Sequence, residues 1–350
     1  MLQTVGACCH DWQASAARAT FRLPYETMPV PLSAILRAQE FLKQHLPQTR
    51  LVAAPSISPR SGGNVYLKLE TDLPTGSFKP RGALYALSVN LAQRKVSEVV
   101  ASSTGNHGAA VAYAAKLLGV RATIFLPENP NPVKRGKIAA LDANVVEHGP
   151  DLVEGFELAS AYAQTHPDVF FLNDATDPDL PAGPATIGCE VVDQLPEVDA
   201  IYVPMGDTAL IRGVASAVRH LANKKVRIIG VQAERAPAYY LSWKQGEAVS
   251  TETCDTIADG LATRTPDAEN VREIRELVDD VRLVSEQEML GAIRHLLFEE
   301  HVAAEPSGAA ATAVLLQANT DMRGNTVALV TGANVTPEVL RRAVNFVRGG

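Results

Sequence analysis

The stretch EVVASSTGNHGAAVAYAAKLLGVRATIFL, residues 98–126, decides the fold class. Glu98–Ala101 predicts a short strand, and the alanine-rich segment Asn106–Leu118 predicts a helix. Ala122–Leu126 predicts a second strand. A strand, a helix and a second strand at this spacing form the basic unit of a parallel sheet covered by helices.

The same alternation extends to both sides of this stretch and predicts an α/β protein with mostly parallel strands. Ligands in such folds bind at the carboxyl ends of the strands. Glycine-containing turns follow Ala101, Pro204 and Val330, where strands are expected to end. Further strands are expected at Val65–Glu70, Asn144–Glu147, Val169–Leu172, Ala200–Pro204, Val226–Gln232 and Thr326–Val330, and further helices at Phe78–Asn90, Val133–Leu141, Gly183–Gln194, Thr208–Leu221 and Pro337–Arg348.

Composition excludes several classes of function. The chain has 350 residues, 46% of them apolar, and a net charge of −7, which suits one large or two modest domains. Without a long Lys/Arg block, nucleic-acid binding is disfavoured, and an acidic surface would repel anionic membranes. No run of about 18 apolar residues exists, so no membrane span is expected.

The N-terminal residues 1–20 lack the apolar core of a signal peptide and are expected to be a flexible extension. The cysteines Cys8, Cys9, Cys189 and Cys254 fit neither a disulfide framework nor a zinc site. Cys8 and Cys9 beside His10 invite a metal interpretation, but reduced thiols on a loose terminus are favoured. A reducing cytoplasm is the expected location.

Lys79 follows a Gly-Ser turn in TGSFKPRG, residues 75–82, and opens an expected helix. Inside a pocket, loss of hydration would lower the pKa of its ammonium group. A neutral lysine amine can form a Schiff base with an aldehyde and later abstract a proton. A solvated lysine at a helix start is the commoner case, so these residues alone leave both interpretations open.

A second candidate is SSTGNHG, residues 102–108, between a strand and a helix. The first amides of the helix could bind an anion such as an amino-acid carboxylate, with the hydroxyls of Ser103 and Thr104 as further donors. The amide of Asn106 could donate to a phenolate. A simple capping turn is an equal alternative, and His107 alone is more typical of a structural histidine than of a catalytic base.

Two further turns follow apolar strands. In MGDTAL, residues 205–210, free amides could bind a phosphate, although a single glycine is a weak pattern. The carboxylate of Asp207 would repel a phosphate, so we expect it to point away or to cap the helix, with Thr208 donating its hydroxyl. In TGAN, residues 331–334, the Thr331 hydroxyl could meet a ring nitrogen, but a turn that closes the sheet is the simpler explanation.

Together and in this order, these segments resemble the fold-type II pyridoxal-phosphate family, most closely its serine/threonine dehydratases and serine racemase. The resemblance runs from about Thr49 to the C-terminus. It implies two open, twisted, mostly parallel sheets flanked by helices, with a large cofactor-binding domain at 21–97 plus 175–350 and a small domain at 98–174. Its motifs are SFKPRGA at 77–83, SSTGNHG at 102–108, TIADG at 256–260, EPSGAA at 305–310 and TGAN at 331–334.

The resemblance also implies pyridoxal 5'-phosphate as cofactor, bound as a Schiff base on Lys79. Phe78 would pack near the ring, Asn106 would contact its phenolic oxygen, and Thr331 would hydrogen-bond the ring nitrogen. Glu305 would line the pocket. The substrate carboxylate would bind to the loop of Ser103, Thr104, Gly105, Asn106 and His107, and the cofactor phosphate to Gly206, Asp207, Thr208, Ala209 and Leu210.

The chain departs from the family in three places. GDTAL replaces a tetraglycine phosphate loop. Thr104 stands where serine racemase has its acid/base serine, which makes Thr104 a catalytic candidate but disfavours racemisation. Gln232, Ala236 and Ala238 replace the racemase's cation site; because a hard cation needs several oxygen ligands, we expect no metal there.

The resemblance implies a lyase that converts L-threonine, L-serine or a related 3-hydroxy amino acid to a 2-oxo acid and ammonia. A threonine hydroxyl cannot keep the ring nitrogen protonated, which favours prompt loss of the β-substituent. Amino-acid racemisation, another β-elimination or β-replacement, and a non-catalytic binding protein are the alternatives. An amine leaving group is disfavoured because diaminopropionate lyases have an acidic residue at the position of Thr104. The resemblance also implies a homodimer. Because only about two helical turns follow Asn334, we expect no C-terminal regulatory domain and no feedback inhibition by isoleucine.

Overall fold

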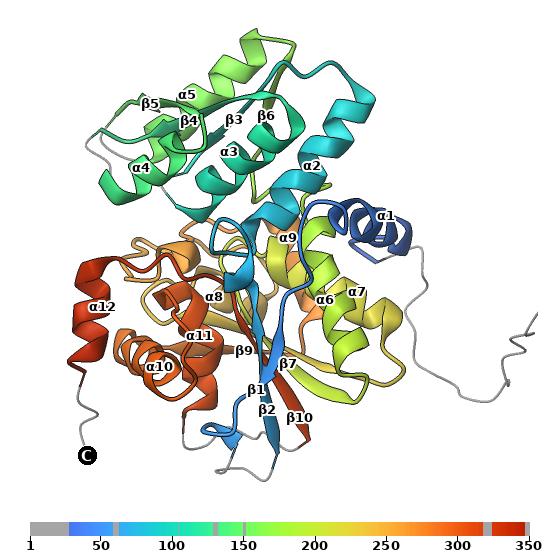
Figure 1. Ribbon diagram of the computed structural model, residues 1–350, viewed down its shortest axis with the longest axis vertical. Helices are drawn as coiled ribbons and strands as arrows, with labels where there is room; N and C mark the ends of the chain where they lie inside the picture. The colour runs from blue at the N-terminus through green and yellow to red at the C-terminus, as the bar shows by residue number, and fades with distance from the viewer. Residues whose placement is uncertain are drawn as a thin grey trace, which may run out of the picture.

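The computed structural model describes residues 28–58, 63–103, 105–128, 132–149, 152–317 and 324–346. The expected extension at residues 1–20, with Cys8 and Cys9, lies outside these ranges, as does Thr104. Within them, strands form one sheet of six and one of four. Helices accompany both sheets (Figure 1). No described helix is long and apolar enough to cross a membrane.

The six-stranded sheet has the order β1-β2-β10-β7-β8-β9. Only the pairing of β1 with β2 is antiparallel; all the other pairs are parallel. Its inner strands read as almost continuous apolar runs because helices cover both faces. The strands are β1 (Leu51–Ala53), β2 (Asn64–Leu69), β7 (Val198–Pro204), β8 (Arg227–Ala233), β9 (Asp280–Val284) and β10 (Asn325–Val330).

The four-stranded sheet is entirely parallel, in the order β5-β4-β3-β6. Its strands are β3 (Glu98–Ser102), β4 (Arg121–Leu126), β5 (Asn144–Glu147) and β6 (Val169–Phe171), and its helices are α3 (Asn106–Leu118), α4 (Pro132–Ala139) and α5 (Leu152–Thr165). Helix α2 (Lys79–Gln93) packs against both α3 and α6 and thereby links the two sheets (Figure 1). The boundaries of the two domains remain a prediction.

The remaining helices surround the six-stranded sheet (Figure 1). They are α1 (Leu32–Leu42), α6 (Ala182–Gln194), α7 (Ala209–Leu221), α8 (Ala238–Gln245), α9 (Ala268–Leu277), α10 (Glu286–Phe298), α11 (Pro306–Leu315) and α12 (Pro337–Val344). Side chains at several starts satisfy backbone amides: Ser285 forms a capping box, and Asp267 and Thr336 accept from the first turns.

Helix α7 begins one residue later than predicted. Thr208 has φ 74° and ψ −12°, which is the left-handed region, so the helix starts at Ala209. The chain thus makes a sharp turn between the end of β7 and the start of α7. A glycine would adopt this conformation without steric cost, whereas a β-branched threonine is rare there.

Candidate active site

A cavity of about 220 Å³ lies where the two sheets meet. The turns after β3, β7 and β10 and the segment after β6 contribute to its wall, as expected for a parallel α/β fold. It is lined by Phe78, Lys79, Ser103, Gly105, Asn106, His107, Asp174, Pro204, Gly206, Asp207, Thr208, Leu210, Asp259, Gly260, Leu261, Ala262, Thr263, Glu305, Ser307 and Thr331.

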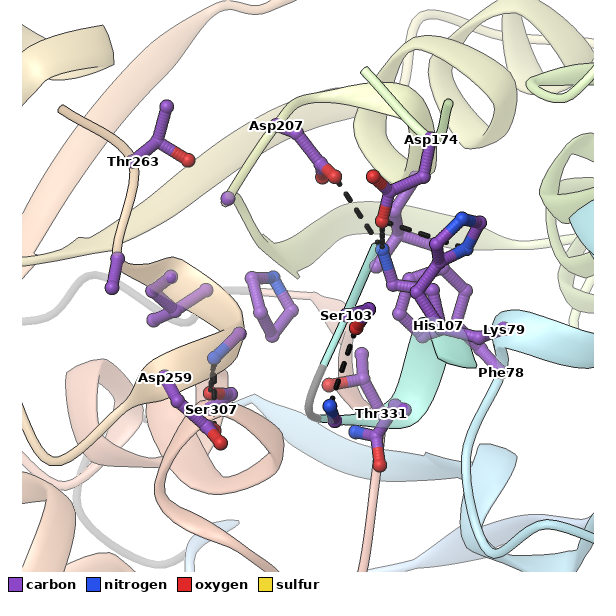
Figure 2. A pocket seen from close by; sticks show the side chains of 18 of the residues that line it. Phe78, Lys79, Ser103, His107, Asp174, Asp207, Asp259, Thr263, Ser307 and Thr331 are labelled. Carbon is purple, nitrogen blue, oxygen red and sulfur yellow. Dashed lines mark hydrogen bonds and ion pairs between the residues drawn. The ribbon is translucent and has the colours of Figure 1, made fainter. Parts of the chain in front are cut away.

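Lys79 opens α2 and extends into this cavity with 14% of its side chain exposed. Its Nζ lies 2.7 Å from Oδ2 of Asp174 and 3.5 Å from Oδ2 of Asp207, as Figure 2 shows. The Phe78 ring centroid is 5.4 Å from the same nitrogen. The lysine amine is therefore held between two carboxylates from separate segments.

The predicted lowering of the pKa of Lys79 is wrong for this state of the protein. Burial does act to lower the pKa of the ammonium, but the negative charges of Asp174 and Asp207 outweigh burial and raise it above the ordinary lysine value. Desolvation can be anticipated from the sequence around Lys79, whereas the two carboxylates come from distant segments of the chain. Lys79 is accordingly a buried ammonium ion here.

The two carboxylates differ from each other in acidity. Burial, and then the charge of Asp174, raise the pKa of Asp207 to about 7. Burial also acts to raise the pKa of Asp174, but positive charge on His107 and Lys79 outweighs it, so that this pKa lies well below the ordinary range. Burial lowers the pKa of His107, which leaves Lys79 as the cation that keeps Asp174 ionised near pH 7.

His107 itself has the contacts of a structural histidine. Its side chain is 5% exposed, its Nε2 lies 2.9 Å from the carbonyl oxygen of Leu172, and its Nδ1 lies 3.6 Å from Asp174. It lies beside Asp174 in Figure 2. The contact between His107 and Asp174 joins α3 to the segment that follows β6.

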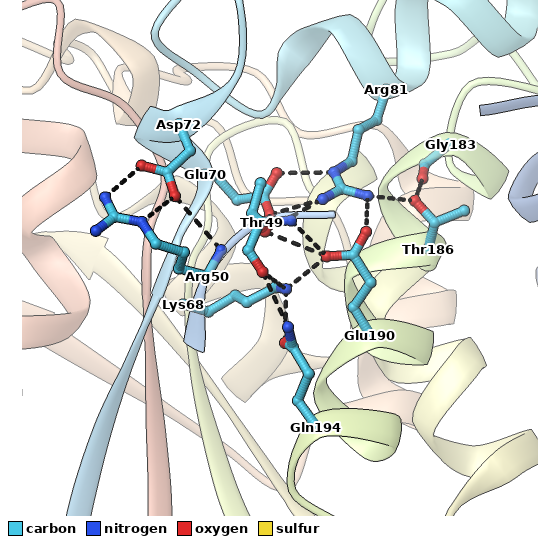
Figure 3. A network of polar contacts seen from close by, with 10 residues as sticks. All are labelled: Thr49, Arg50, Lys68, Glu70, Asp72, Arg81, Gly183, Thr186, Glu190 and Gln194. Carbon is cyan, nitrogen blue, oxygen red and sulfur yellow. Dashed lines mark hydrogen bonds and ion pairs between the residues drawn. The ribbon is translucent and has the colours of Figure 1, made fainter. Parts of the chain in front are cut away.

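A buried ionic network fixes the start of α2, two residues after Lys79 (Figure 3). Arg81 is 2% exposed and forms ion pairs with Glu70 at 2.8 Å and Glu190 at 2.6 Å. Lys68, fully buried, lies 2.5 Å from Glu190 and donates to Gln194. The positive charges of Arg81 and Lys68 equal in number the negative charges of Glu70 and Glu190. The four side chains connect β2, α2 and α6.

The side-chain amide of Asn106 is held from both ends. Its Nδ2 donates to Oε1 of Glu305 at 2.5 Å, and its Oδ1 accepts from Nδ2 of Asn334 at 2.7 Å. Asn334 also accepts from Lys137 and donates to the carbonyl of Thr75. These contacts determine which end of the Asn106 amide is the nitrogen, and they leave one of its N–H bonds for a ligand.

In the loop before α3, Gly105 is the N-terminal cap, and no side chain caps the helix. Ser103 instead accepts from the Gly105 amide through its Oγ at 3.2 Å. Among the described residues, no side chain caps α3, so capping by Ser103 is wrong; Thr104, the other capping candidate, lies outside the described residues. Ser103, Gly105, Asn106 and His107 all line the cavity.

The turn between β7 and α7 differs from the prediction at Asp207. This residue neither points away nor caps the helix: its carboxyl group faces the amine of Lys79. Attraction to a buried ammonium explains the orientation. Gly206 has no room for a side chain, because a Cβ would lie 2.2 Å from the carbonyl oxygen of Gly260. Ala209 packs in the apolar core, so only its backbone could serve a ligand.

The cavity has donors suited to a phosphate and to an aromatic ring. The Thr208 Oγ1 is buried and has no hydrogen-bond partner among the described residues, and it lies at a helix end whose first amides also lack intrahelical partners. Thr331 lines the wall and its carbonyl accepts from the Phe78 amide. Lys79, Thr208 and Thr331 therefore fit pyridoxal phosphate, and Asp207 is the carboxyl group in the β7–α7 turn that a phosphate would meet unfavourably.

Asp174 is the main functional candidate that the sequence argument missed. It follows the predicted strand Val169–Leu172 by two residues, and a carboxylate at the carboxyl end of a parallel strand is the signal that could have found it. Other lining residues were also unassigned: Asp259, Gly260, Leu261, Ala262, Thr263 and Ser307. Of these, Asp259 and Gly260 belong to the quoted TIADG motif, and Ser307 to EPSGAA.

No described group of three or more His, Cys, Asp or Glu side chains could hold a metal ion. At the position compared with a cation site, Gln232 is fully buried and its Oε1 accepts from the Tyr240 amide. Ala236 and Ala238 are likewise buried in the core.

Two mostly parallel sheets with a buried lysine at their junction define the class of α/β enzymes that act through a lysine-bound cofactor. Residues 42–332 match the family described as "Pyridoxal-phosphate dependent enzyme". The chain therefore belongs to the family of pyridoxal-phosphate-dependent enzymes, as the motifs predicted, and its cofactor is pyridoxal phosphate.

Known relatives include L-threonine ammonia-lyase of Thermotoga maritima, 35% identical over 90% of this chain and 78% of the relative. The catabolic L-threonine dehydratase TdcB of Escherichia coli is 32% identical over 91% of this chain and 98% of the relative. Among solved structures, threonine deaminase isoform 2 of Solanum lycopersicum has a TM-score of 0.84 and 29% identity, covering 90% of this chain and 93% of that one. Maize serine racemase has a TM-score of 0.83 and 27% identity, covering 89% and 96%.

Proposed function

We propose that this chain is a lyase that removes water and then ammonia from L-threonine or L-serine, giving a 2-oxo acid. The observation that supports it most directly is Lys79, a nearly buried amine in a cavity that also contains Asn106 and Thr331. The relatives named for threonine deamination align over about nine-tenths of the chain.

Several of the lining residues have a proposed task. Pyridoxal phosphate, when bound, supplies an aldehyde that bonds to amines and a ring that withdraws electrons from the substrate's α-carbon. Lys79 would hold the cofactor through its amine and, as a neutral amine, would take the substrate's α-proton. Asn106, fixed by Glu305 and Asn334, donates to the phenolic oxygen.

The remaining tasks concern anions and the ring nitrogen. The loop Ser103–His107, with Thr104, binds the substrate carboxylate, and the turn Gly206–Leu210 binds the phosphate through its backbone amides and the Thr208 hydroxyl. Phe78 packs near the ring. Thr331 offers its hydroxyl to the ring nitrogen, and because a hydroxyl carries no negative charge, it favours loss of the β-hydroxyl over a long-lived carbanion.

The test is purified, cofactor-loaded protein incubated with L-threonine and with L-serine, with 2-oxo acid measured by its reaction with a carbonyl reagent. We expect 2-oxobutyrate and pyruvate. The variant Lys79→Ala should lose both turnover and the visible absorbance of the covalently bound cofactor. Cofactor-loaded wild-type protein that makes no 2-oxo acid from a panel of hydroxy-amino acids would refute the lyase assignment.

Racemisation is the second candidate, favoured by the likeness to maize serine racemase. Thr104, in place of the racemase's acid/base serine, opposes it. Chiral chromatography of L-serine recovered after incubation distinguishes the two activities. Rapid formation of D-serine with little pyruvate would favour the racemase.

We also propose that the chain acts in the cytoplasm as a homodimer, as in the family it resembles, on a free amino acid. The reduced state expected for Cys189 and Cys254 suits that compartment. Light scattering on the purified protein measures the mass; a monomer at micromolar concentration would contradict the dimer.

A further inference from the structure

The turn between β7 and α7 places an acid beside the amine that must react. Asp207 follows Gly206 directly, and its Oδ2 lies 3.5 Å from Nζ of Lys79 (Figure 2). A quarter of the Asp207 side chain is exposed, within the same cavity. The turn that would receive an anionic phosphate therefore also contains a group able to exchange a proton with Lys79.

Lys79 must lose a proton before the cofactor can be attached to it. Only a neutral amine attacks an aldehyde, yet Asp174 at 2.7 Å and Asp207 at 3.5 Å stabilise Lys79 as an ammonium ion. Asp174 cannot accept the proton readily, because its pKa is depressed. Asp207, with a pKa raised to about 7, is much the better acceptor.

Other charged or titratable groups around this pair do not replace Asp207. From α3, His107 faces Asp174 rather than Asp207. From α7 and α9, Arg212 is paired with Glu273 at 2.8 Å. On α8, the Tyr239 hydroxyl contacts Asn270, whose side chain donates to the backbone carbonyl of Asp207.

We propose that Asp207 is the proton acceptor for Lys79: as an anionic phosphate enters the turn at Gly206–Leu210, the proton moves from Lys79 to Asp207 and frees the amine to bond to the cofactor aldehyde. The proposal rests on the site proposed above and adds a residue to its proton chemistry. An anion close to a carboxyl group favours the neutral form of that group, so the phosphate drives the transfer in this direction.

The step balances. One N–H bond of the Lys79 ammonium breaks and one O–H bond of Asp207 forms, with no change in the charge of the protein. The neutral amine then bonds to the aldehyde carbon, and one water molecule is released. Protonated Asp207 is also uncharged, which removes its repulsion of the phosphate and explains how a carboxyl group is compatible with this turn.

The experiment uses the full-length protein freed of cofactor, mixed rapidly with pyridoxal phosphate between pH 6 and pH 9. The rate of covalent attachment at Lys79 is read from visible absorbance. Noncovalent binding is measured separately with pyridoxamine phosphate, which has the phosphate but no aldehyde. The variants are Asp207→Asn and Asp207→Gly. Asp259→Asn is the matched control, because Asp259 lines the same cavity but its carboxylate does not contact Lys79.

We expect wild type and Asp259→Asn to attach the cofactor at rates that rise from pH 6 to about pH 8, as Asp207 ionises, and that change little above this. In Asp207→Asn and Asp207→Gly the proton must leave to water, so the rate at pH 7 should fall at least about tenfold and then rise by about tenfold per pH unit, as the neutral fraction of an amine does below its pKa. Both variants should bind pyridoxamine phosphate at least as tightly as wild type.

Attachment rates in both Asp207 variants that follow the wild-type pH profile would overturn the proposal. Loss of pyridoxamine phosphate binding in both would also overturn it, since Asp207 would then serve binding rather than proton transfer. The attachment measurements contain no amino acid and are independent of the 2-oxo acid assay. Failure to form 2-oxo acid in that separate assay would contradict the proposed lyase but not the role of Asp207 in proton transfer.

Discussion

Thr208 combines two unfavourable features in one residue. Its backbone is left-handed with φ 74°, and its hydroxyl is buried with no partner in the part of the chain that the structure describes. Strain and unsatisfied groups of this kind persist where a ligand makes use of them. We interpret the hydroxyl as a phosphate donor whose hydrogen bond forms only when the cofactor binds.

Replacing Thr208 should therefore separate stability from cofactor affinity. In the cofactor-free protein, Thr208→Gly should be more stable than Thr208→Ala by about 1 kcal/mol, because both lack the hydroxyl and only alanine retains the left-handed cost. Both should bind pyridoxamine phosphate more weakly than wild type. Denaturant unfolding and a binding titration measure the two effects; unchanged affinity in both variants would contradict the role of the hydroxyl.

Asp207 should also affect stability through pH. A carboxyl group whose pKa is raised to about 7 in the folded protein holds a proton that the unfolded chain loses near pH 4. Between these values the folded state binds more protons, so the contribution of this group to stability falls as pH rises from 4 to 7.

The substitution Asp207→Asn removes the fall in stability that Asp207 causes as the pH rises. The variant should gain stability over the cofactor-free wild type, and the gain should be larger at pH 8 than at pH 5. Urea unfolding at the two pH values provides the measurement. A gain that is equal at both, or larger at pH 5, would show that Asp207 is not a raised-pKa acid.

At the scale of elements, α2 determines where Lys79 lies. The helix starts at the reactive residue itself, and Arg81 ties that first turn to Glu70 on the β2 side and to Glu190 on α6. Apolar contacts alone would let a helix end shift. A set of directional, buried ion pairs specifies one position, and we propose this as the reason for the network.

Removing one member of the network should be costly. Glu190→Gln leaves Arg81 and Lys68 short of one negative charge in a buried site, so we expect a loss of about 3 kcal/mol in the free energy of unfolding. The exposed pair of Arg50 with Asp72, shown in the same Figure 3, is the control. Asp72→Asn should cost less than about 1 kcal/mol; equal costs in the two variants would contradict a structural role for burial.

The sequence predicted only part of the elements. It missed α1, α5, α8, α9, α10, β1 and β9, although α10 begins with a capping box. The helix Asn106–Leu118 and the strand Asn144–Glu147 were predicted with the observed bounds. Helix α11 was missed because all ten of its residues are buried and it has no polar face to reveal a helical period. Helix α7 was begun one residue early, since a left-handed threonine has no sequence signal.

For the whole molecule, the site lies at the junction of the two sheets, and residues far apart in the chain meet there. Lys79 and Asp174 are 95 positions apart, and Lys79 and Asp207 are 128 apart. Motifs identified Lys79, Asn106 and Thr331 because local turns present them. The position of Asp174 after a predicted strand could have marked it as a candidate, but its contact with Lys79 and the direction of the lysine's pKa shift depend on how the sheets pack and were not predictable from local sequence.

The account depends on the covalent bond between Lys79 and pyridoxal phosphate, and borohydride trapping tests it most directly. Reduction of the cofactor-loaded protein, proteolysis and mass spectrometry locate the modified lysine. We predict that the cofactor is found on the peptide containing Lys79 and nowhere else. Recovery of an unmodified Lys79 peptide from protein that holds its cofactor at another lysine would contradict the account.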